Sequence, residues 1–336
     1  MINDSNPEIQ FAMEAVRAGA LLAREVEREM GEPALTKEDR SPVTVADFAV
    51  QGLIACLLEK TFPTAALVAE EDAAQLREPE AASTCRQVAA YVGRRLAYAT
   101  PETVCAWIDR GNAAPRGRFW TLDPIDGTKG FLRGDQYAVG MALVDEGEVV
   151  LAAMACPNLN DAHRPEPGGA GTLVVAARGQ GAWWQPLETG GKLRPLRVSD
   201  REDVAQIRIL RSFETGHTNV GRIERMAAAV GVTAEAVRMD SQAKYAVLAS
   251  GHAELLLRLL TAKQPDYRER IWDQAAGALI TEEAGGRITD LDGRRLDFST
   301  GRMLVNNRGV CATNGRVHDE VLDTLRAVCE AGDRQP

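Results

Sequence analysis

The sequence has no run of apolar residues long enough to cross a membrane. Nothing in its 336 residues approaches the roughly 18 consecutive apolar residues of a transmembrane helix. The N-terminus also has no basic segment followed by an apolar one. These absences exclude a transmembrane helix, and we expect a soluble, cytoplasmic protein.

Paired metal-binding cysteines are also missing. The six cysteines are scattered, with no C-x-x-C pair and no histidine pairing of the kind that binds zinc. In a chain of this length they are expected to be reduced thiols in the core or at the surface. Internal repeats and low-complexity tracts are absent as well.

The sequence has fewer basic than acidic residues. The chain carries 39 lysine and arginine residues against 48 aspartate and glutamate residues, which gives a net charge of -9. This balance argues against a general binder of nucleic acid or of anionic membranes. A polyanionic substrate would therefore need local positive charge.

What the sequence does have is an acidic turn within residues 119–134, FWTLDPIDGTKGFLRG. The aromatic and aliphatic residues from Phe119 to Leu122 predict a strand, which Pro124 is expected to end. Asp123 and Asp126 would then lie at the carboxyl end of that strand. This is where α/β proteins bind their ligands.

The two residues after Asp126 suit a phosphate group. Gly127 lets the backbone approach a ligand closely, and Thr128 begins a predicted short helix whose free amide hydrogens favour a phosphate oxygen. A lone D-P-x-D-G is more often a surface loop. Three further acidic sites, each after a strand or at the start of a helix, favour a Mg²⁺ site instead: Glu70 in the E-E-D that follows Ala65 to Ala69, Asp47 at the end of SPVTVAD, and Asp273 in RIWDQAAG.

Two local patterns bear on these sites. A helical pattern from Thr44 onward places Asp47 in a first turn, where the helix dipole alone favours a carboxylate. That purely structural role is the alternative to a catalytic one. In residues 98–117, four residues are expected to break any regular structure: Pro101, Gly111, Pro115 and Gly117.

Seven segments together form a larger pattern: SPVTVAD (41–47), VAEED (68–72), WTLDPIDGTKGFLRG (120–134), YAVGMALVDEGEVVLAAMACPNL (137–159), ARGQGAWW (177–184), DSQAKYAVLASGHAELLLR (240–258) and IWDQAAGALITEEAGG (271–286). They resemble the inositol monophosphatase-type, metal-dependent phosphatases. Within that family they look most like the 3'(2'),5'-bisphosphate nucleotidases, which remove the 3'-phosphate from adenosine 3',5'-bisphosphate. The K-G-F-L-R-G and D-S-Q-x-K-Y segments point to this branch.

The fold class follows from the order of the predicted elements, and the arrangement of the layers follows from the resemblance. Alternating strands and helices suggest an α/β (α+β) layered sandwich, and the resemblance implies the αβαβα arrangement. The length suits a large core and two domains. Because proline and glycine crowd residues 163–171, we predict an N-terminal α+β domain, 1–160, with most metal ligands. A C-terminal α/β domain, 161–336, would carry Asp273 and the substrate-specificity residues.

Hydrolysis of a phosphate monoester requires charge neutralisation on the transferred group and a nucleophile near pH 7. Two Mg²⁺ ions can supply both, and at least four carboxylates are needed to hold them. The resemblance adds the backbone carbonyl of Ile125 as a ligand and places Asp47 near a third ion or the water. Four carboxylates meet the count: Glu70, Asp123, Asp126 and Asp273.

By the same resemblance, Asp47 and Thr128 would orient the attacking water, with Glu70 in the catalytic set. The amides of Gly127 and Thr128 would hold phosphate oxygens. Neither a cysteine nucleophile, a serine-histidine pair nor a phosphoenzyme aspartate motif is apparent. Direct attack by water is therefore the simpler mechanism.

The substrate contacts also follow from the resemblance. His217 would pack on the adenine, while Ser241, Lys244 and Arg258 would receive the phosphate that is not cleaved. Three of them have a plainer alternative: His217 as an exposed loop residue, Lys244 as a solvated helix charge, and Arg258 as the partner of Glu254 or another strand residue.

These expectations combine into a Mg²⁺-dependent, lithium-sensitive phosphatase acting on adenosine 3',5'-bisphosphate and also on its phosphosulfate, PAPS. An inositol monophosphatase or other small sugar phosphatase is the first alternative, and a nucleotide or metal sensor on the same scaffold is the second. The expected partner is a small phosphorylated nucleotide, with no nucleic acid and no membrane. The protein would be a monomer or a homodimer.

Overall fold

The computed structural model describes residues 2–30, 42–213, 219–261 and 263–332. Its helices alternate with strands along most of the chain. The α-helices are α1 (Pro7–Met30), α2 (Pro42–Thr61), α3 (Ala82–Gly93), α4 (Pro101–Asp109), α5 (Thr128–Arg133), α6 (Val220–Ala229), α7 (Ala243–Ala249), α8 (Ile271–Glu283) and α9 (His318–Gly332). Short 3-10 helices are η1 (Gln75–Arg77), η2 (Pro79–Ala81) and η3 (Val204–Gln206).

The described strands form three sheets. A seven-stranded sheet has the order β1 (Ala66–Ala69), β2 (Arg118–Asp126), β3 (Ala138–Asp145), β4 (Glu148–Cys156), β7 (Thr172–Ala177), β8 (Gly181–Pro186) and β9 (Arg194–Pro195). A five-stranded sheet has the order β11 (Val237–Arg238), β10 (Ile209–Arg211), β12 (Leu255–Arg258), β14 (Val310–Thr313) and β13 (Arg287–Thr289). The third sheet pairs β5 (Leu159–Asn160) with β6 (Arg164–Pro165).

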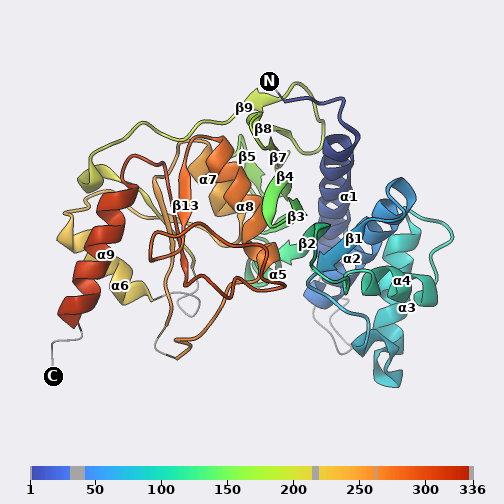
Figure 1. Ribbon diagram of the computed structural model, residues 1–336. Coiled ribbons are helices and arrows are strands. Elements are labelled where there is room, and N and C mark those ends of the chain that lie inside the picture. The colour runs from blue at the N-terminus through green and yellow to red at the C-terminus, as the bar shows by residue number, and fades with distance from the viewer. Residues whose placement is uncertain (1, 31–41, 214–218, 262, 333–336) are drawn as a thin grey trace.

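Helices and the two larger sheets alternate in layers (Figure 1). Buried side chains of α1 and α2 pack on one face of the seven-stranded sheet. Those of α7 and α8 fill the space between its other face and the five-stranded sheet, while α6 and α9 cover the far side of the smaller sheet. The predicted αβαβα sandwich is confirmed.

The first helix follows from its sequence. The side chain of Asn6 accepts the backbone N–H of Glu8 at 2.8 Å, and Pro7 takes the first helical position, where its missing N–H costs nothing. Ala12, Val16 and Ala20 are fully buried along one face. The amphipathic spacing of the sequence therefore gives a helix that packs against the sheet.

Three local expectations were wrong. Residues 98–117 contain helix α4, because Pro101 occupies its first turn and Thr100 caps it, accepting the N–H of Thr103 at 3.3 Å. Helix α2 begins at Pro42, so Asp47 lies beyond its first turn. Pro124 does not end β2: the ladder to β3 resumes at Asp126 after an irregularity.

Several other elements match the sequence patterns. The hairpin of β3 and β4 turns at Glu146 and Gly147, both with positive φ. Met141 and Met154, on these two strands, lie in the core. The described cysteine thiols are free and buried: Cys56, Cys85, Cys105, Cys156 and Cys311.

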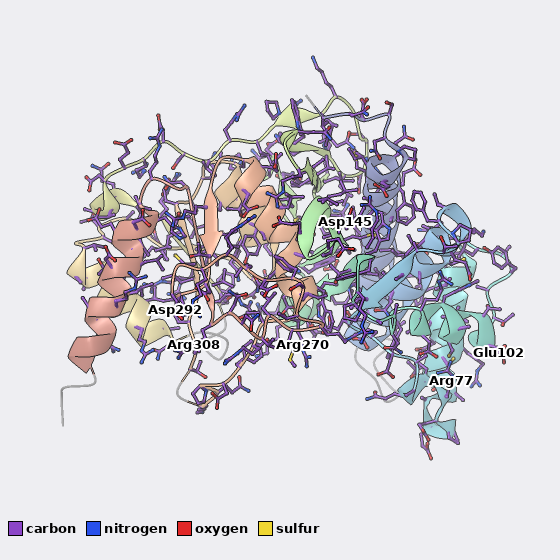
Figure 2. The ribbon with its side chains drawn as sticks, viewed as in Figure 1. Arg77, Glu102, Asp145, Arg270, Asp292 and Arg308 are labelled. Atoms are coloured by element: carbon purple, nitrogen blue, oxygen red, sulfur yellow. The ribbon has the colours of Figure 1, made fainter. Side chains whose placement is uncertain are left out.

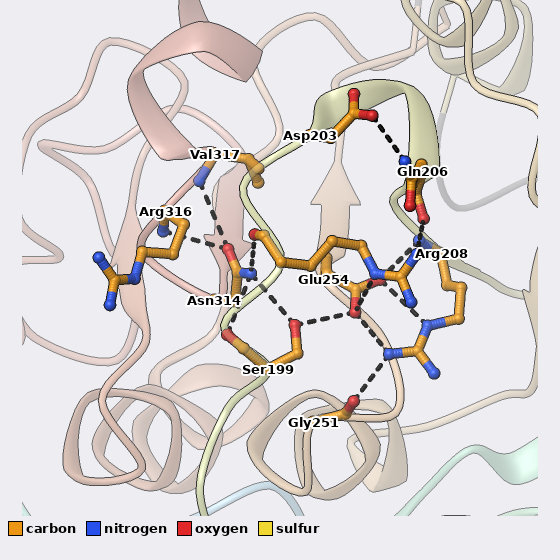
Figure 3. Close-up of polar contacts among 10 residues, drawn as sticks. Ser199, Asp203, Gln206, Arg208, Gly251, Glu254, Asn314, Arg316 and Val317 are labelled. Carbon is orange, nitrogen blue, oxygen red and sulfur yellow. Dashed lines mark hydrogen bonds and ion pairs between the residues drawn. The ribbon is translucent and has the colours of Figure 1, made fainter.

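A buried carboxylate ties together the second half of the chain (Figure 3). Glu254 has no exposed surface, and its Oε2 accepts the backbone N–H of Arg208 at 2.7 Å. Its Oε1 accepts the Ser199 hydroxyl at 2.9 Å, and Ser199 in turn binds Asn314. This network joins the segment before β10 to the start of β12 and to the end of β14. Glu254 is therefore occupied away from the acidic turn.

The division into domains at residue 160 stays a prediction. In the structure β7 and β8 extend the sheet begun by β1 to β4, so that sheet continues past residue 160.

Within the described part of the chain, no helix has both the length and the apolar character needed to span a bilayer.

Candidate active site

A cavity of about 340 Å³ opens where β1 and β2 end against α7, β12 and α8. Residues from both halves of the chain line it. Asp47 is not among the lining residues, and His217 lies outside the described residues. The lining includes ten of the residues selected from the sequence: Glu70, Asp123, Ile125, Asp126, Gly127, Thr128, Ser241, Lys244, Arg258 and Asp273.

The pairing of β1 with β2 brings the first two carboxylates together. The strands are parallel and Ala69 is opposite Leu122, so the next residues along the two chain segments, Glu70 after β1 and Asp123 within β2, lie side by side. Asp123 is only 1% exposed, and the Glu70 carboxylate lies close enough to raise its pKa. Asp273 reaches the same cavity from the first turn of α8.

Burial and mutual repulsion raise the pKa values of these acids. The pKa of Asp123 is well above its usual range because the group is buried and because Glu70, Asp126 and Asp273 are close to it. Burial also raises the pKa of Glu70, with the charge of Asp126 adding to the shift. Asp273 behaves in the same way, although Arg258 partly offsets its shift. The nearby basic side chains therefore offset the repulsion among these acids only in part.

Asp47 and Glu71 form a second acidic layer beside the cavity. Burial raises the pKa of Asp47, and the nearby Glu71 and Glu70 raise it further. The pKa of Glu71 rises to about 7 through burial and the proximity of Glu70 and Asp72.

Gln51 holds this layer in place, since its Nε2 donates to the Glu71 carbonyl at 2.6 Å and its Oε1 accepts the Glu71 N–H at 3.0 Å. The sequence reasoning missed Gln51. Its place one helical turn after Asp47, on the same face of α2, was the available signal.

The glycines of the acidic turn are required by close packing. Gly127 has φ +92, and a Cβ there would lie 2.6 Å from the Cβ of Ser241. A Cβ on Gly130 would lie 2.1 Å from the carbonyl oxygen of Gln136. An ion pair between Arg133 and Asp240 also joins the turn to the D-S-Q segment. Two motifs more than a hundred residues apart thus form one unit.

The predicted cations lie at the same cavity as the acids. Lys244 is 6% exposed, and its Nζ donates to the Ser212 hydroxyl at 2.8 Å. Burial, with a contribution from Arg258, lowers the pKa of Lys244 to about 8. The alternative of a solvated helix charge is therefore wrong.

Arg258 pairs with Glu269, with 2.9 Å between Nε and Oε2. Burial alone would lower its pKa, but the carboxylates of Glu269 and Asp273 raise it above its usual value. The expected alternative partner, Glu254, is instead bound by Arg208. Arg258 is thus a partly buried, permanently charged group at the cavity.

Residues distant in sequence support the site in ways that no local motif predicted. Arg302 donates to the backbone carbonyls of Ala69 and Gly111, which fixes the end of β1 next to Glu70. Its guanidinium lies 4.8 Å from the ring centre of Trp272, and Arg270 lies over the same ring. Arg270, labelled in Figure 2, stands at the start of α8 between the two halves of the molecule.

The donor set suits a hard divalent cation. One carboxylate oxygen of Asp123, Oδ1, is buried with no hydrogen-bond partner, and the neighbouring acids raise one another's pKa values. A cation would relieve both conditions. Among the described residues, no three His, Cys, Asp or Glu side chains already converge as a finished metal site. The fit therefore rests on charge and donor chemistry.

Comparison with known proteins gives one consistent result. Residues 4–330 match the model of the inositol monophosphatase family. The chain is 40% identical to the 3'(2'),5'-bisphosphate nucleotidase of Emericella nidulans, over 94% of this chain and 96% of that protein. It is 37% identical to the nucleotidase of the same name from Oryza sativa, over 95% of this chain and 93% of the relative.

Solved structures agree on the fold. Mycobacterium tuberculosis SuhB superposes with a TM-score of 0.63 at 21% identity, over 97% of this chain and 98% of the other. CysQ from Bacteroides thetaiotaomicron gives a TM-score of 0.61 at 18% identity, over 92% and 97%. With the acidic turn, the layered fold and the family match in agreement, the chain belongs to the inositol monophosphatase family.

Proposed function

We propose that this protein is a Mg²⁺-dependent 3'(2'),5'-bisphosphate nucleotidase that removes the 3'-phosphate of adenosine 3',5'-bisphosphate and of PAPS. The observation that carries the proposal is the joint presence, in one cavity, of four acids and two cations, of which Asp123 and Lys244 are buried. The acids would bind the metal ion, and the metal ion would contact the phosphate that reacts. The cations, Lys244 and Arg258, suit a second phosphate that only binds.

The residues at the end of β2 would hold the ions. Asp126 and the carbonyl of Ile125 would act with three further carboxylates, and Asp47 would serve a third ion or the water. When bound, Mg²⁺ neutralises phosphate charge and lowers the pKa of a water molecule so that it can attack near pH 7. The three further carboxylates are Glu70, Asp123 and Asp273.

The chain's own groups would then orient the reactants. Asp47 and the hydroxyl of Thr128, with Glu70, would direct the water oxygen at phosphorus, and the amides of Gly127 and Thr128 would hold phosphate oxygens. The new bond joins the water oxygen to phosphorus, and the bond from phosphorus to the ribose 3'-oxygen breaks. The 3'-oxygen leaves as a hydroxyl, giving adenosine 5'-monophosphate and inorganic phosphate.

Substrate choice would depend on the second anion. Ser241, Lys244 and Arg258 would bind the 5'-phosphate, and His217 would pack on the adenine. An inositol monophosphate or another sugar monophosphate has no second phosphate for the two cations. The presence of both cations at one cavity therefore favours a bisphosphate over the sugar-phosphatase alternative.

The test is phosphate release from a panel of substrates with and without Mg²⁺. We expect turnover of adenosine 3',5'-bisphosphate to exceed that of inositol monophosphate and to stop after chelation. Li⁺ is close to Mg²⁺ in size but has half its charge, so it should inhibit, with NaCl as the ionic-strength control. Full activity without metal would refute the metal mechanism, and a preference for inositol monophosphate would favour the sugar-phosphatase alternative. Binding without turnover would indicate the sensor.

A further inference from the structure

Gln242 links the two acidic residues of β2 to helices α7 and α8. It immediately precedes α7 and is 2% exposed. Its backbone N–H donates to Oδ2 of Asp126, and its side-chain Nε2 donates to Oδ2 of Asp123 at 3.2 Å. The same Nε2 donates to the carbonyl of Trp272 at 3.2 Å. One residue therefore touches both strand acids and the residue that precedes Asp273.

The orientation of this amide is determined by its neighbours. Both groups that face Nε2 are acceptors, so turning the amide over would place oxygen against oxygen. On the other side the amide packs against Gly140 of β3, where a Cβ would lie 3.2 Å from Oε1 and 3.3 Å from Nε2. Gly140 is opposite Asp123 in the ladder, so the glycine leaves room for the amide beside that acid.

The contact also selects one oxygen of Asp123. Gln242 occupies Oδ2, whereas Oδ1 is buried without a hydrogen-bond partner. A donor that fixes one carboxylate oxygen leaves the other free to bind a cation in a defined direction. The side chain of Gln242 makes no helix-capping hydrogen bond, so its polar contacts go to the site and not to α7.

We propose that Gln242 is a positioning residue: it fixes Asp123 and Asp126 for cation binding and ties them to the helix that carries Lys244. The inference rests on the proposed function, because it assumes that these acids bind the metal. Removing a hydrogen bond to a metal-binding carboxylate typically weakens metal affinity about 10- to 100-fold. We expect a loss of that size when the Gln242 amide is removed.

The experiment measures binding of Mn²⁺ alone, by loss of the free-ion EPR signal, in the full-length protein. Mn²⁺ favours the same oxygen ligands as Mg²⁺. Gln242→Met keeps the length of the side chain and the backbone N–H but removes the amide. The matched control is Asn307→Leu, because Asn307 is also a buried amide, with bonds to Asp290, Arg295 and Asp297 far from the cavity.

We expect Gln242→Met to bind Mn²⁺ about 10- to 100-fold more weakly, with the control at wild-type affinity even if its melting temperature falls. Wild-type affinity in Gln242→Met would overturn the inference. Asp126→Asn separates the two ideas: if that change also left binding intact, the proposed metal site itself would be wrong.

A second variant keeps the test decisive should Gln242→Met not fold. Gly140→Ala changes no polar group but pushes on the amide, which must shift by a few tenths of an ångström. We expect a smaller loss of Mn²⁺ affinity, several-fold, in the same direction. Unchanged affinity in a folded Gly140→Ala protein would count against positioning by Gln242.

Discussion

The two walls of the cavity differ in how their charges are compensated. The acidic wall, made of Glu70, Asp123, Asp126 and Asp273, holds carboxylates that raise one another's pKa values. The basic wall consists of Lys244 and Arg258, and each of these has a fixed partner of its own. The acidic wall is thus incomplete without a cation, whereas the basic wall is already assembled.

Asp126 lies where the walls meet. Burial raises its pKa, but Arg258 and Lys244 act in the opposite direction, and the backbone N–H of Gln242 donates to it. The contrast teaches that the acids should govern the reaction itself, while the cations should govern which phosphate ester is accepted. Four measurements can separate these roles.

The largest effect is expected from the acidic wall. Asp126→Asn and Asp273→Asn should each lower phosphate release by orders of magnitude for every substrate, because each removes a negative ligand from the proposed metal site. Circular dichroism should show an intact fold. The metal-free melting temperature should not fall, since the change removes a carboxylate whose charge is disfavoured in the folded state. Near-normal activity in either variant would remove that residue from the metal site.

A smaller and more selective effect is expected from the basic wall. Lys244→Ala removes a charge-assisted contact of about 1.5–3 kcal/mol, or roughly 10- to 150-fold in kcat/KM, for adenosine 3',5'-bisphosphate. A 3'-monophosphate that lacks the second group should lose little. Lys192→Ala, at an exposed lysine remote from the cavity, is the matched control. An equal loss of kcat/KM for mono- and bisphosphates would contradict the role of Lys244 in binding the second phosphate.

Raising the pH should weaken the binding of a phosphate to the basic wall. The pKa of Lys244 is lowered to about 8 by burial, so the lysine is mostly charged at pH 7 and mostly neutral at pH 9. Because a phosphate prefers the charged form, binding of adenosine 5'-monophosphate should weaken by about tenfold between these values. Calorimetry should show this slope in the wild type and not in Lys244→Ala. A flat wild-type profile would contradict the prediction.

The smallest effect concerns the base and not the phosphates. His217→Ala should weaken adenine nucleotides by about 2- to 12-fold in KM, the range expected for one aromatic contact, and should spare inositol 1,4-bisphosphate. Steady-state kinetics with both substrates would test this. A loss shared by the inositol compound would assign His217 to the phosphates or to the fold.

Much of the architecture could be predicted from local sequence. The hairpin of β3 and β4, the first helix and the helix that begins before Asp273 follow from apolar periodicity and turn residues. The acidic turn could be selected because Asp, Pro, Gly and Thr stand there in an order that suits metal and phosphate. Local rules failed at two prolines. Pro101 was expected to break regular structure but begins a helix, and Pro124 was expected to end β2 but only interrupts it.

The supporting residues could not be found in this way. Gln51, Gln242 and Arg302 act through side chains that reach another element, and only Gln51, one helical turn after Asp47, has a local signal. The sequence left two roles for Lys244, a phosphate contact or a solvated helix charge, and only the structure showed that it is buried against Ser212 and beside Arg258. Burial and partners depend on the packing of distant segments.

By itself, the sequence determined the elements and the chemical types available to the site: four acids, a glycine turn and two cations. Residue order and periodicity act over a few positions, so the elements, the acids and the glycine turn could be inferred without coordinates, whereas the two cations followed from the family resemblance. Only the tertiary structure decided that Asp123 keeps one oxygen free, that Arg258 pairs with Glu269 and not Glu254, and that Gln242 joins both acids to α7. Those outcomes depend on parallel pairing of β1 with β2 and on the packing of α7 and α8 against the sheet, which bring together residues more than a hundred positions apart.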